Sequence, residues 1–180
     1  MAALYGRGNN GYCVLIFGSL DMTQQKKSFT ARGGLWVLAQ LPLMLLVLVI
    51  PLRFGAGHFV PEEPVQMAGA AVMGLGAALI VWWFISLGDA LSPFPRPLDE
   101  AVLHRQGAFR LMRHPIYSGV ILTSLGWTLW WLCGTGVLPV LGLAIFFDRK
   151  AAREEVWLRE KYKDYPNYAR RVKKFIPGVY

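Results

Sequence analysis

Charged residues are scarce in this sequence. Asp, Glu, Lys and Arg together make up 17% of its 180 residues, whereas they make up about a quarter of an ordinary soluble domain. Hydrophobic residues reach 54%. This shortage of charge argues against a soluble domain and indicates that lipid forms part of the protein's solvent.

Cysteine is almost absent. The chain has two, Cys13 and Cys133, which lie far apart in the sequence. Small disulfide-stabilised domains carry a much denser set of cysteines. The cysteine content therefore excludes that class, and we expect no disulfide.

Acidic residues are also few, with 11 Asp and Glu against 19 Lys and Arg, for a formal net charge of +8. Such a charge can indicate nucleic-acid binding, but basic residues beside apolar segments are more simply orientation signals and contacts to anionic lipid. Four precede residue 35, one lies between the first two apolar stretches, four lie in 89–114 and ten follow residue 147. The positive-inside rule then places both termini in the cytoplasm, on the inner membrane in a bacterium, and we predict no nucleic-acid partner.

Long apolar stretches account for most of the sequence. They predict membrane helices at about 35–52, 65–87, 116–133 and 137–150, and a spanning helix needs about 20 residues. The uncharged "CGTG" between the last two stretches predicts a tight hairpin. We therefore expect an all-α integral membrane protein with two transmembrane helices, a transmembrane helical hairpin and a cytoplasmic C-terminal helix. Residues 1–34 are expected to be a disordered or interfacial extension, and 35–180 the membrane domain.

Small residues are concentrated in the second apolar stretch, which contains the sequence "GLG" at 74–76. No strand is expected before it, so a dinucleotide-binding loop is disfavoured. Small residues allow membrane helices to approach closely. The stretch is therefore predicted to pack tightly against a neighbouring helix.

The predicted hairpin brings two polar segments to the same height. His114 lies 21 residues before Thr135 and Glu154 lies 19 residues after it, so at 1.5 Å of rise per residue their heights differ by about 3 Å. Because the fourth apolar stretch is short, Lys150 and Glu155 should also lie near the membrane boundary. These residues predict a polar pocket, although helix anchoring and a solvated charged face explain each of them separately.

Several ordered motifs resemble one known family. "GAFRLMRHPIYSG" (107–119), the apolar hairpin, and "FFDRKAAREEVWLREKYKDYPNYARRVKKFIPG" (146–178) are similar to the isoprenylcysteine carboxyl methyltransferase family, which includes related phospholipid N-methyltransferase-like membrane proteins. "LGDALSPFPRP" (87–97) resembles bacterial members. The resemblance covers roughly residues 80–180.

The resemblance implies S-adenosylmethionine as the cofactor, held by the "HPIY" run, by the first glutamate of "REE" and by the segment before Gly107 that closes over it. The cofactor-binding residues implied for this chain are Leu103, His104, Phe109, Arg113, His114, Pro115, Ile116, Tyr117 and Glu154. No metal site is predicted. Carboxylates suit the positive charges of this cofactor, and aromatic rings suit its adenine and its sulfonium.

The chain departs from the family's pattern at three places. Phe109 and Ala101 stand where the family often has Tyr and His, and Lys150 stands where it has an Arg associated with the substrate carboxylate. Arg149 is adjacent and could replace that Arg, so Lys150 and Arg149 are both predicted to bind substrate, and Arg149 also to act in catalysis. Glu155 is the second predicted catalytic residue, as the base for an amine acceptor.

The sequence thus favours a carboxyl O-methyltransferase acting on a lipophilic or prenylated acceptor at the cytoplasmic interface, with membrane lipid as a further partner. A carboxylate acceptor is already ionised at neutral pH and needs little acid or base catalysis. One alternative is a phospholipid or small-amine N-methyltransferase, whose activity would rise with pH. The other is a non-enzymatic scaffold or transporter subunit that uses the hairpin for packing.

Overall fold

The computed structural model describes residues 34–57, 63–87 and 103–180. The elements in these ranges are α1 (Gly34–Phe54), α2 (Pro64–Leu87), α3 (Ala108–Leu111), α4 (Pro115–Trp130), the 3-10 turn η2 (Gly134–Gly136), α5 (Val137–Lys161) and α6 (Tyr165–Arg171). The described part of the chain is thus helical and contains no strand, apart from one isolated bridge between Met112 and Lys173. The predicted all-α class is confirmed for these residues.

Two helices have the length and apolarity needed to cross a membrane. They are α1, with 21 residues, and α2, with 24 residues, which correspond to the first two predicted spans. Helix α4 has 16 residues, so at helical rise it is about 24 Å long, shorter than the hydrocarbon core of a bilayer. A hairpin that crosses the membrane therefore stays a prediction. Residues 1–33, nearly all of the predicted N-terminal extension, lie outside the described residues.

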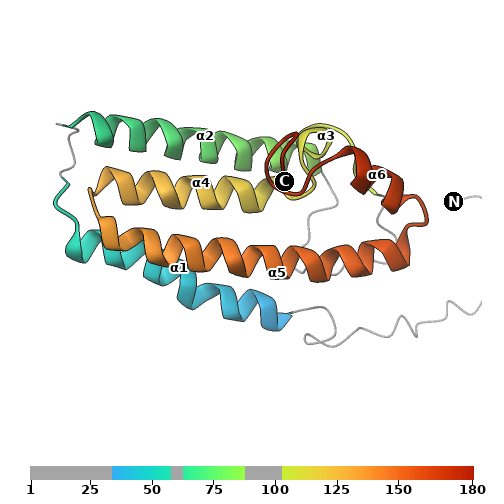
Figure 1. Ribbon diagram of the computed structural model, residues 1–180, viewed down its shortest axis with the longest axis horizontal. Coiled ribbons are helices and arrows are strands. Elements are labelled where there is room, and N and C mark those ends of the chain that lie inside the picture. The colour runs from blue at the N-terminus through green and yellow to red at the C-terminus, as the bar shows by residue number, and fades with distance from the viewer. Residues whose placement is uncertain (1–33, 58–62, 88–102) are drawn as a thin grey trace, which may run out of the picture.

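The helices lie side by side in a bundle, with α4 between α2 and α5 (Figure 1). Helix α1 runs along α5 on the side away from α2. The buried apolar core lies between α1, α4 and α5 and includes Val47, Tyr117, Leu143 and Phe147. Phe147 and Ala151 are its last members along α5, and they adjoin the polar residues Lys150 and Glu154 of the same helix.

Helices α1 and α2 turn large apolar side chains outward. Leu41 and Leu45 on α1 are 57% and 59% exposed, and Ile85 on α2 is 75% exposed. Only 11% of the most apolar window of each helix is buried. A soluble monomer rarely exposes so large an apolar surface, so these two faces are suited to contact with lipid.

Glycines set the close approach of α2 and α4. A methyl group built on Gly126 of α4 would lie 2.4 Å from the backbone nitrogen of Met73 and 2.5 Å from the carbonyl oxygen of Gly69. By contrast, a methyl group on Gly74 meets nothing within 4 Å. The predicted role of small residues in helix packing is therefore confirmed for Gly69 and not for Gly74.

This difference predicts the effect of two alanine substitutions. Gly126→Ala should lower the free energy of unfolding by about 1–3 kcal/mol, because backbone atoms must move apart to admit the methyl group. Gly74→Ala is the matched control, and its higher helix propensity should leave stability equal or raise it by up to about 1 kcal/mol. Thermal unfolding in detergent measures both changes. Equal midpoints for the two variants would contradict the close packing of α2 on α4.

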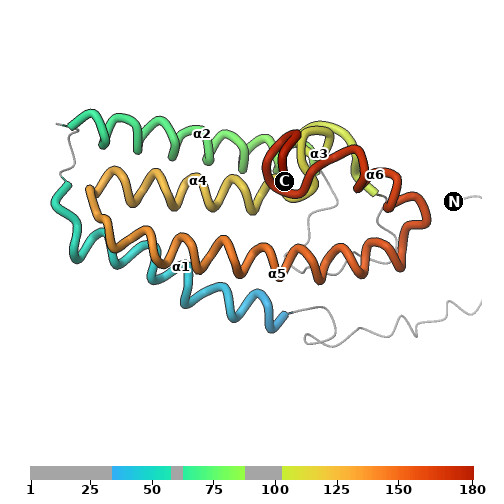
Figure 2. The backbone as a smooth tube through the Cα atoms, in the orientation of Figure 1, coloured from blue at the N-terminus to red at the C-terminus, as the bar shows by residue number. Residues whose placement is uncertain are grey.

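The charged residues of the C-terminal third gather at one end of the bundle. Helix α5 continues beyond the start of α4, and α3, α6 and the C-terminus lie together there (Figure 2). The C-terminal segment, residues 172–180, lies across the start of α4. The backbone N–H groups of Arg113 and His114 donate to the carbonyl oxygens of Lys173 and Lys174, at 2.8 and 3.1 Å. The C-terminal segment therefore forms one wall of the region around His114.

Candidate active site

The site is built where α4 begins. His114 is the residue immediately before α4, and Pro115 occupies the first helical position, where its missing N–H leaves no intrahelical bond unmade. On α5, the helix that returns from the hairpin turn, Glu154 and Glu155 lie opposite. The structure thus brings together His114 and Glu154, which helical rise predicts to lie at nearly the same height.

Glu154 is held by an aromatic hydroxyl and an imidazole. The hydroxyl of Tyr117 donates a hydrogen bond to Oε1 of Glu154, and Nδ1 of His114 lies 3.4 Å from Oε2 of the same carboxylate. The rings of His114 and Tyr117 are stacked, with centroids 5.5 Å apart. All three side chains are buried, so the carboxylate has little contact with solvent.

Glu155 is held by two basic side chains. Its Oε1 atom lies 3.2 Å from Nε2 of His114 and 3.2 Å from a guanidinium nitrogen of Arg113. Burial on its own would raise the pKa of Glu155, but the hydrogen bond from His114 and the charges of His114 and Arg113 outweigh burial and lower it. Glu155 is therefore an ionised partner of these cations.

Lys150 lies one helical turn before Glu154 and is only 6% exposed. Its ammonium group donates a hydrogen bond of 2.9 Å to the side-chain oxygen of Gln40 on α1. It also lies 5.2 Å from the centre of the Tyr117 ring. A buried ammonium whose hydrogen-bond partner is a neutral amide is suited to receive an anion.

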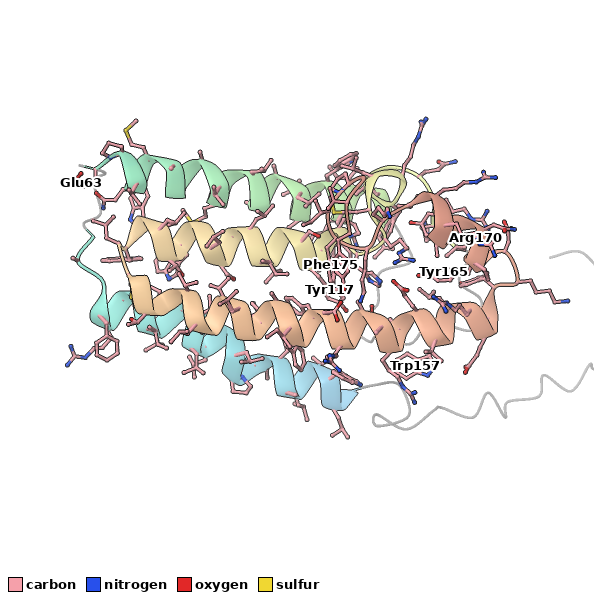
Figure 3. All side chains as sticks on the ribbon, in the orientation of Figure 1. Glu63, Tyr117, Trp157, Tyr165, Arg170 and Phe175 are labelled. Carbon is pink, nitrogen blue, oxygen red and sulfur yellow. The ribbon has the colours of Figure 1, made fainter. Side chains whose placement is uncertain are left out.

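The C-terminal segment adds an aromatic ring to the cluster formed by Arg113, His114, Tyr117, Lys150, Glu154 and Glu155. The ring of Phe175 lies 5.9 Å from that of His114 and 6.4 Å from that of Tyr117, and Figure 3 shows Phe175 and Tyr117 close together beside α5. The carbonyl oxygen of Phe175 also accepts a hydrogen bond of 2.8 Å from Ser118. This segment therefore covers the cluster from the side of α4.

The remaining predicted residues are placed differently. The side chain of Arg149 is exposed, and no described contact joins it to the cluster. Leu103 and His104 are half-buried, and the His104 ring lies 6.2 Å from that of Phe109. Ile116 packs against the apolar core. Residues 101 and 102, the start of the predicted closing segment, lie outside the described residues.

Three residues at or near the cluster were not predicted from the sequence. Gln40 had a usable signal, because it is the one polar side chain in an otherwise apolar stretch, and polar residues within membrane helices usually face a functional interior. Phe175 and Tyr165 had no such signal. The Tyr165 hydroxyl and Nε of Arg113 are buried with no hydrogen-bond partner within the described residues, so both remain available as donors.

The cluster can bind opposite charges side by side. Its carboxylates and aromatic rings suit a cationic group, and the ammonium of Lys150 and the guanidinium of Arg113 suit an anionic one. Within the ranges that the structure describes, no group of three or more His, Cys, Asp or Glu residues is arranged to hold a metal ion. The charges and rings of the cluster suit the binding and alignment of charged organic groups.

The stability of this cluster should depend on pH through His114. Burial lowers the pKa of His114, but hydrogen bonds to Glu154 and Glu155 and their charges outweigh burial and raise the pKa above its ordinary value of 6.5. A raised pKa favours the imidazolium in the folded state, so its stabilisation is complete below about pH 6.5 and is lost as the pH rises through the folded-state value. The stability difference between the unsubstituted protein and His114→Gln should therefore shrink as the pH rises above about 6.5. Thermal unfolding of both proteins across this range tests it, and a difference that grows with pH would contradict a protonated His114.

Comparisons with known proteins indicate the family to which the chain is similar. The family model described as phospholipid methyltransferase matches residues 65–165. A probable protein-S-isoprenylcysteine O-methyltransferase of Oryza sativa subsp. indica is 37% identical over 84 residues, which cover 45% of this chain and 44% of that protein. Its counterpart in Oryza sativa subsp. japonica gives the same figures. The match thus spans less than half the length of these curated relatives.

Proposed function

Because this chain belongs to the phospholipid methyltransferase family, we propose that it is a membrane methyltransferase that uses S-adenosylmethionine to methylate the carboxylate of a lipophilic acceptor. The observation that carries the choice of acceptor is the buried ammonium of Lys150, whose hydrogen-bond partner is the neutral amide of Gln40. The names of the rice relatives, which are isoprenylcysteine O-methyltransferases, support the same choice.

The residues of the cluster fit this cofactor. Glu154 would lie near its positive charges, and the rings of Tyr117, Phe109 and Phe175 would contact its adenine or its sulfonium. The unpartnered Nε of Arg113 and the unpartnered hydroxyl of Tyr165 are donors for its carboxylate. When bound, S-adenosylmethionine supplies an electrophilic methyl group.

The chain's own part in the reaction is alignment and exclusion of water. Lys150 would hold the acceptor carboxylate beside the cluster, and the Tyr117 hydroxyl fixes Glu154 in place. Phe147 and Phe175 cover the region with apolar surface, which removes water from the carboxylate nucleophile. A carboxylate needs no deprotonation at neutral pH, so no general base is required.

Arg149 stays in the proposal as a second candidate for the acceptor carboxylate. Its exposed side chain could reach an acceptor that approaches from the membrane boundary, as a long basic side chain can along an apolar surface. The buried side chain of Lys150 is nevertheless the better match for a desolvated carboxylate. The substitutions Lys150→Met and Arg149→Met distinguish which of the two residues binds the acceptor.

Transfer to an amine is the second candidate function, because the description of the matched family names phospholipid as the acceptor. An amine acceptor must lose a proton, and Glu155 would be the base. The salt bridges of Glu155 to Arg113 and His114 lower its pKa and make it a weak base. The structure therefore favours the carboxylate.

The proposed location follows from the charge distribution and the helices. We propose a multi-pass protein with both termini in the cytoplasm, where the cofactor enters, while the acceptor arrives through the bilayer. The exposed apolar faces of α1 and α2 and the ten basic residues that follow residue 147 support this orientation.

The test is methyl transfer from labelled S-adenosylmethionine to three kinds of acceptor: N-acetyl farnesylcysteine, phosphatidylethanolamine and simple hydrophobic acids. The proposal expects transfer to the prenylated or simple acids, with a weak dependence on pH above neutrality. Transfer to phosphatidylethanolamine that rises with pH and is lost in Glu155→Gln would favour the amine reaction. If calorimetry detects no binding of S-adenosylhomocysteine at millimolar concentration, the protein is the scaffold or transporter subunit instead.

A further inference from the structure

A cavity lies outside the buried cluster, between α3 and α6. Its volume is about 600 Å³, and it is open to solvent. Its polar lining consists of Arg105, Arg110, Arg171, Asp164, Asn167 and Tyr168. Neither the glutamates nor the histidine of the cluster belong to it, so the proposed methyl transfer does not explain this cavity.

The walls of the cavity are held in place by two contacts between residues 109–113 and α6. The Tyr168 hydroxyl donates a hydrogen bond of 2.6 Å to the carbonyl oxygen of Phe109. A guanidinium nitrogen of Arg113 lies 3.4 Å from the carbonyl oxygen of Ala169. Both bonds are partly buried. These two contacts link α6 to α3 and to Arg113 in the absence of a ligand.

The charges of the cavity are not balanced. Asp164 is its one carboxylate, and it accepts hydrogen bonds from Arg105, at 2.6 Å, and from Asn167, at 3.0 Å. Arg110 and Arg171 form no ion pair with any residue in the described ranges. Three guanidinium groups thus share one carboxylate, which is paired with Arg105 and is also under the influence of the Arg171 charge. Guanidinium groups of this kind bind oxyanions such as phosphate through paired N–H donors.

Exposed apolar side chains lie on α3, which carries Arg110, and on the C-terminal segment that follows Val172 of the cavity lining. Leu111, which follows Arg110, is 43% exposed, and Ile176 and Val179 in the C-terminal segment are 52% and 71% exposed. The cavity also lies at the charged end of the bundle, where Figure 3 labels Arg170. Basic residues beside exposed apolar ones are typical of surfaces that lie at the headgroup level of a membrane.

We propose that this cavity binds a phosphate group, with Arg110 and Arg171 contacting its oxygens and Arg105 held beside them by Asp164. The shared chemistry is that of a phosphate ester or free phosphate, and the exposed apolar residues favour the headgroup of an anionic phospholipid. The site is separate from the proposed methyl-transfer site and does not depend on it.

The test uses the purified full chain in dodecyl maltoside and follows the thermal unfolding midpoint during a titration. Three probes separate the sources of phosphate: mixed micelles with phosphatidylglycerol, mixed micelles with phosphatidylcholine of the same chain length, and inorganic phosphate at constant ionic strength. The variant is the double substitution Arg110→Gln and Arg171→Gln. The matched control is Arg170→Gln with Lys173→Gln, which removes the same charge from exposed neighbours outside the cavity.

We expect phosphatidylglycerol to stabilise the unsubstituted protein and the control equally, and the cavity variant to need about tenfold more lipid for the same shift. Phosphatidylcholine and inorganic phosphate should act more weakly. If inorganic phosphate alone reproduces the arginine-dependent shift, the membrane source is overturned and the ligand is soluble phosphate. Equal responses of the cavity variant and the control to every probe would overturn the site.

A single substitution keeps the proposal testable if the double variant does not fold. Arg171→Lys keeps the positive charge but removes the paired N–H donors. The proposal expects an intermediate loss of response to phosphatidylglycerol. An unchanged response in a folded Arg171→Lys protein would show that stabilisation by phosphatidylglycerol depends on net charge alone. That result would contradict a binding site.

Discussion

Replacing Glu154 by alanine should weaken binding of S-adenosylhomocysteine by about 10- to 100-fold, because a hydrogen bond to a charged group contributes about 1.5–3 kcal/mol. Glu154 is buried and is oriented by Tyr117 and His114, so its carboxylate is aimed before the ligand binds. Calorimetry in detergent measures the affinity. The result rests on the proposed assignment of the cluster to the cofactor.

Two further variants decide whether such a loss comes from the site. Glu160→Ala removes an exposed carboxylate from the same helix and should leave the affinity unchanged. His114→Ala should also weaken binding, because it removes the other partner that orients Glu154. Circular dichroism must show unchanged helix content in each variant. Unaltered affinity in both Glu154→Ala and His114→Ala would remove the cluster as the cofactor site.

Replacing Lys150 by methionine should lower kcat/KM for a carboxylate acceptor by about 30- to 4000-fold, because losing one partner of a buried charge pair costs about 2–5 kcal/mol. Methionine keeps most of the side-chain volume against Tyr117 and Phe147. Affinity for S-adenosylhomocysteine should change by less than about twofold. Steady-state methylation of N-acetyl farnesylcysteine, together with calorimetry, separates the two effects.

Arg149→Met is the matched control for this experiment. Its side chain is exposed on the same helix turn, so its loss should change kcat/KM by less than about threefold. If Arg149→Met abolishes methylation and Lys150→Met does not, the adjacent arginine is the residue that binds the acceptor. Loss of S-adenosylhomocysteine binding in Lys150→Met would instead place Lys150 in the cofactor site.

The positions of α1, α2 and the hairpin turn along the chain could be predicted from the sequence with little error. The stretches at 35–52 and 65–87 correspond to α1, Gly34–Phe54, and α2, Pro64–Leu87. The hairpin turn was expected at 133–136 and is the 3-10 turn Gly134–Gly136. These boundaries follow from local chemistry, since apolar runs, glycine and charge each act over a few residues.

The meeting of His114 with Glu154 was also predictable, because helical rise is nearly constant and residues can be counted from the turn. The direction in which each side chain points was not. Lys150 and Arg149 are neighbours in the sequence, yet one is buried and the other exposed. A soluble helix reveals its buried face by alternating apolar and polar residues, but a helix in lipid is apolar on both its core face and its lipid face.

The sequence by itself determined that this protein is helical, that it is suited to a membrane, and that it carries the ordered motifs of a methyltransferase family. These properties depend on composition and on spacing along the chain. Only the tertiary structure decided that Gln40 of α1 contacts Lys150, that Phe175 of the C-terminal segment covers His114, and that α3 and α6 enclose a cationic cavity. The reason is that each of these contacts joins residues more than 50 positions apart, and their meeting depends on how the helices rotate and pack.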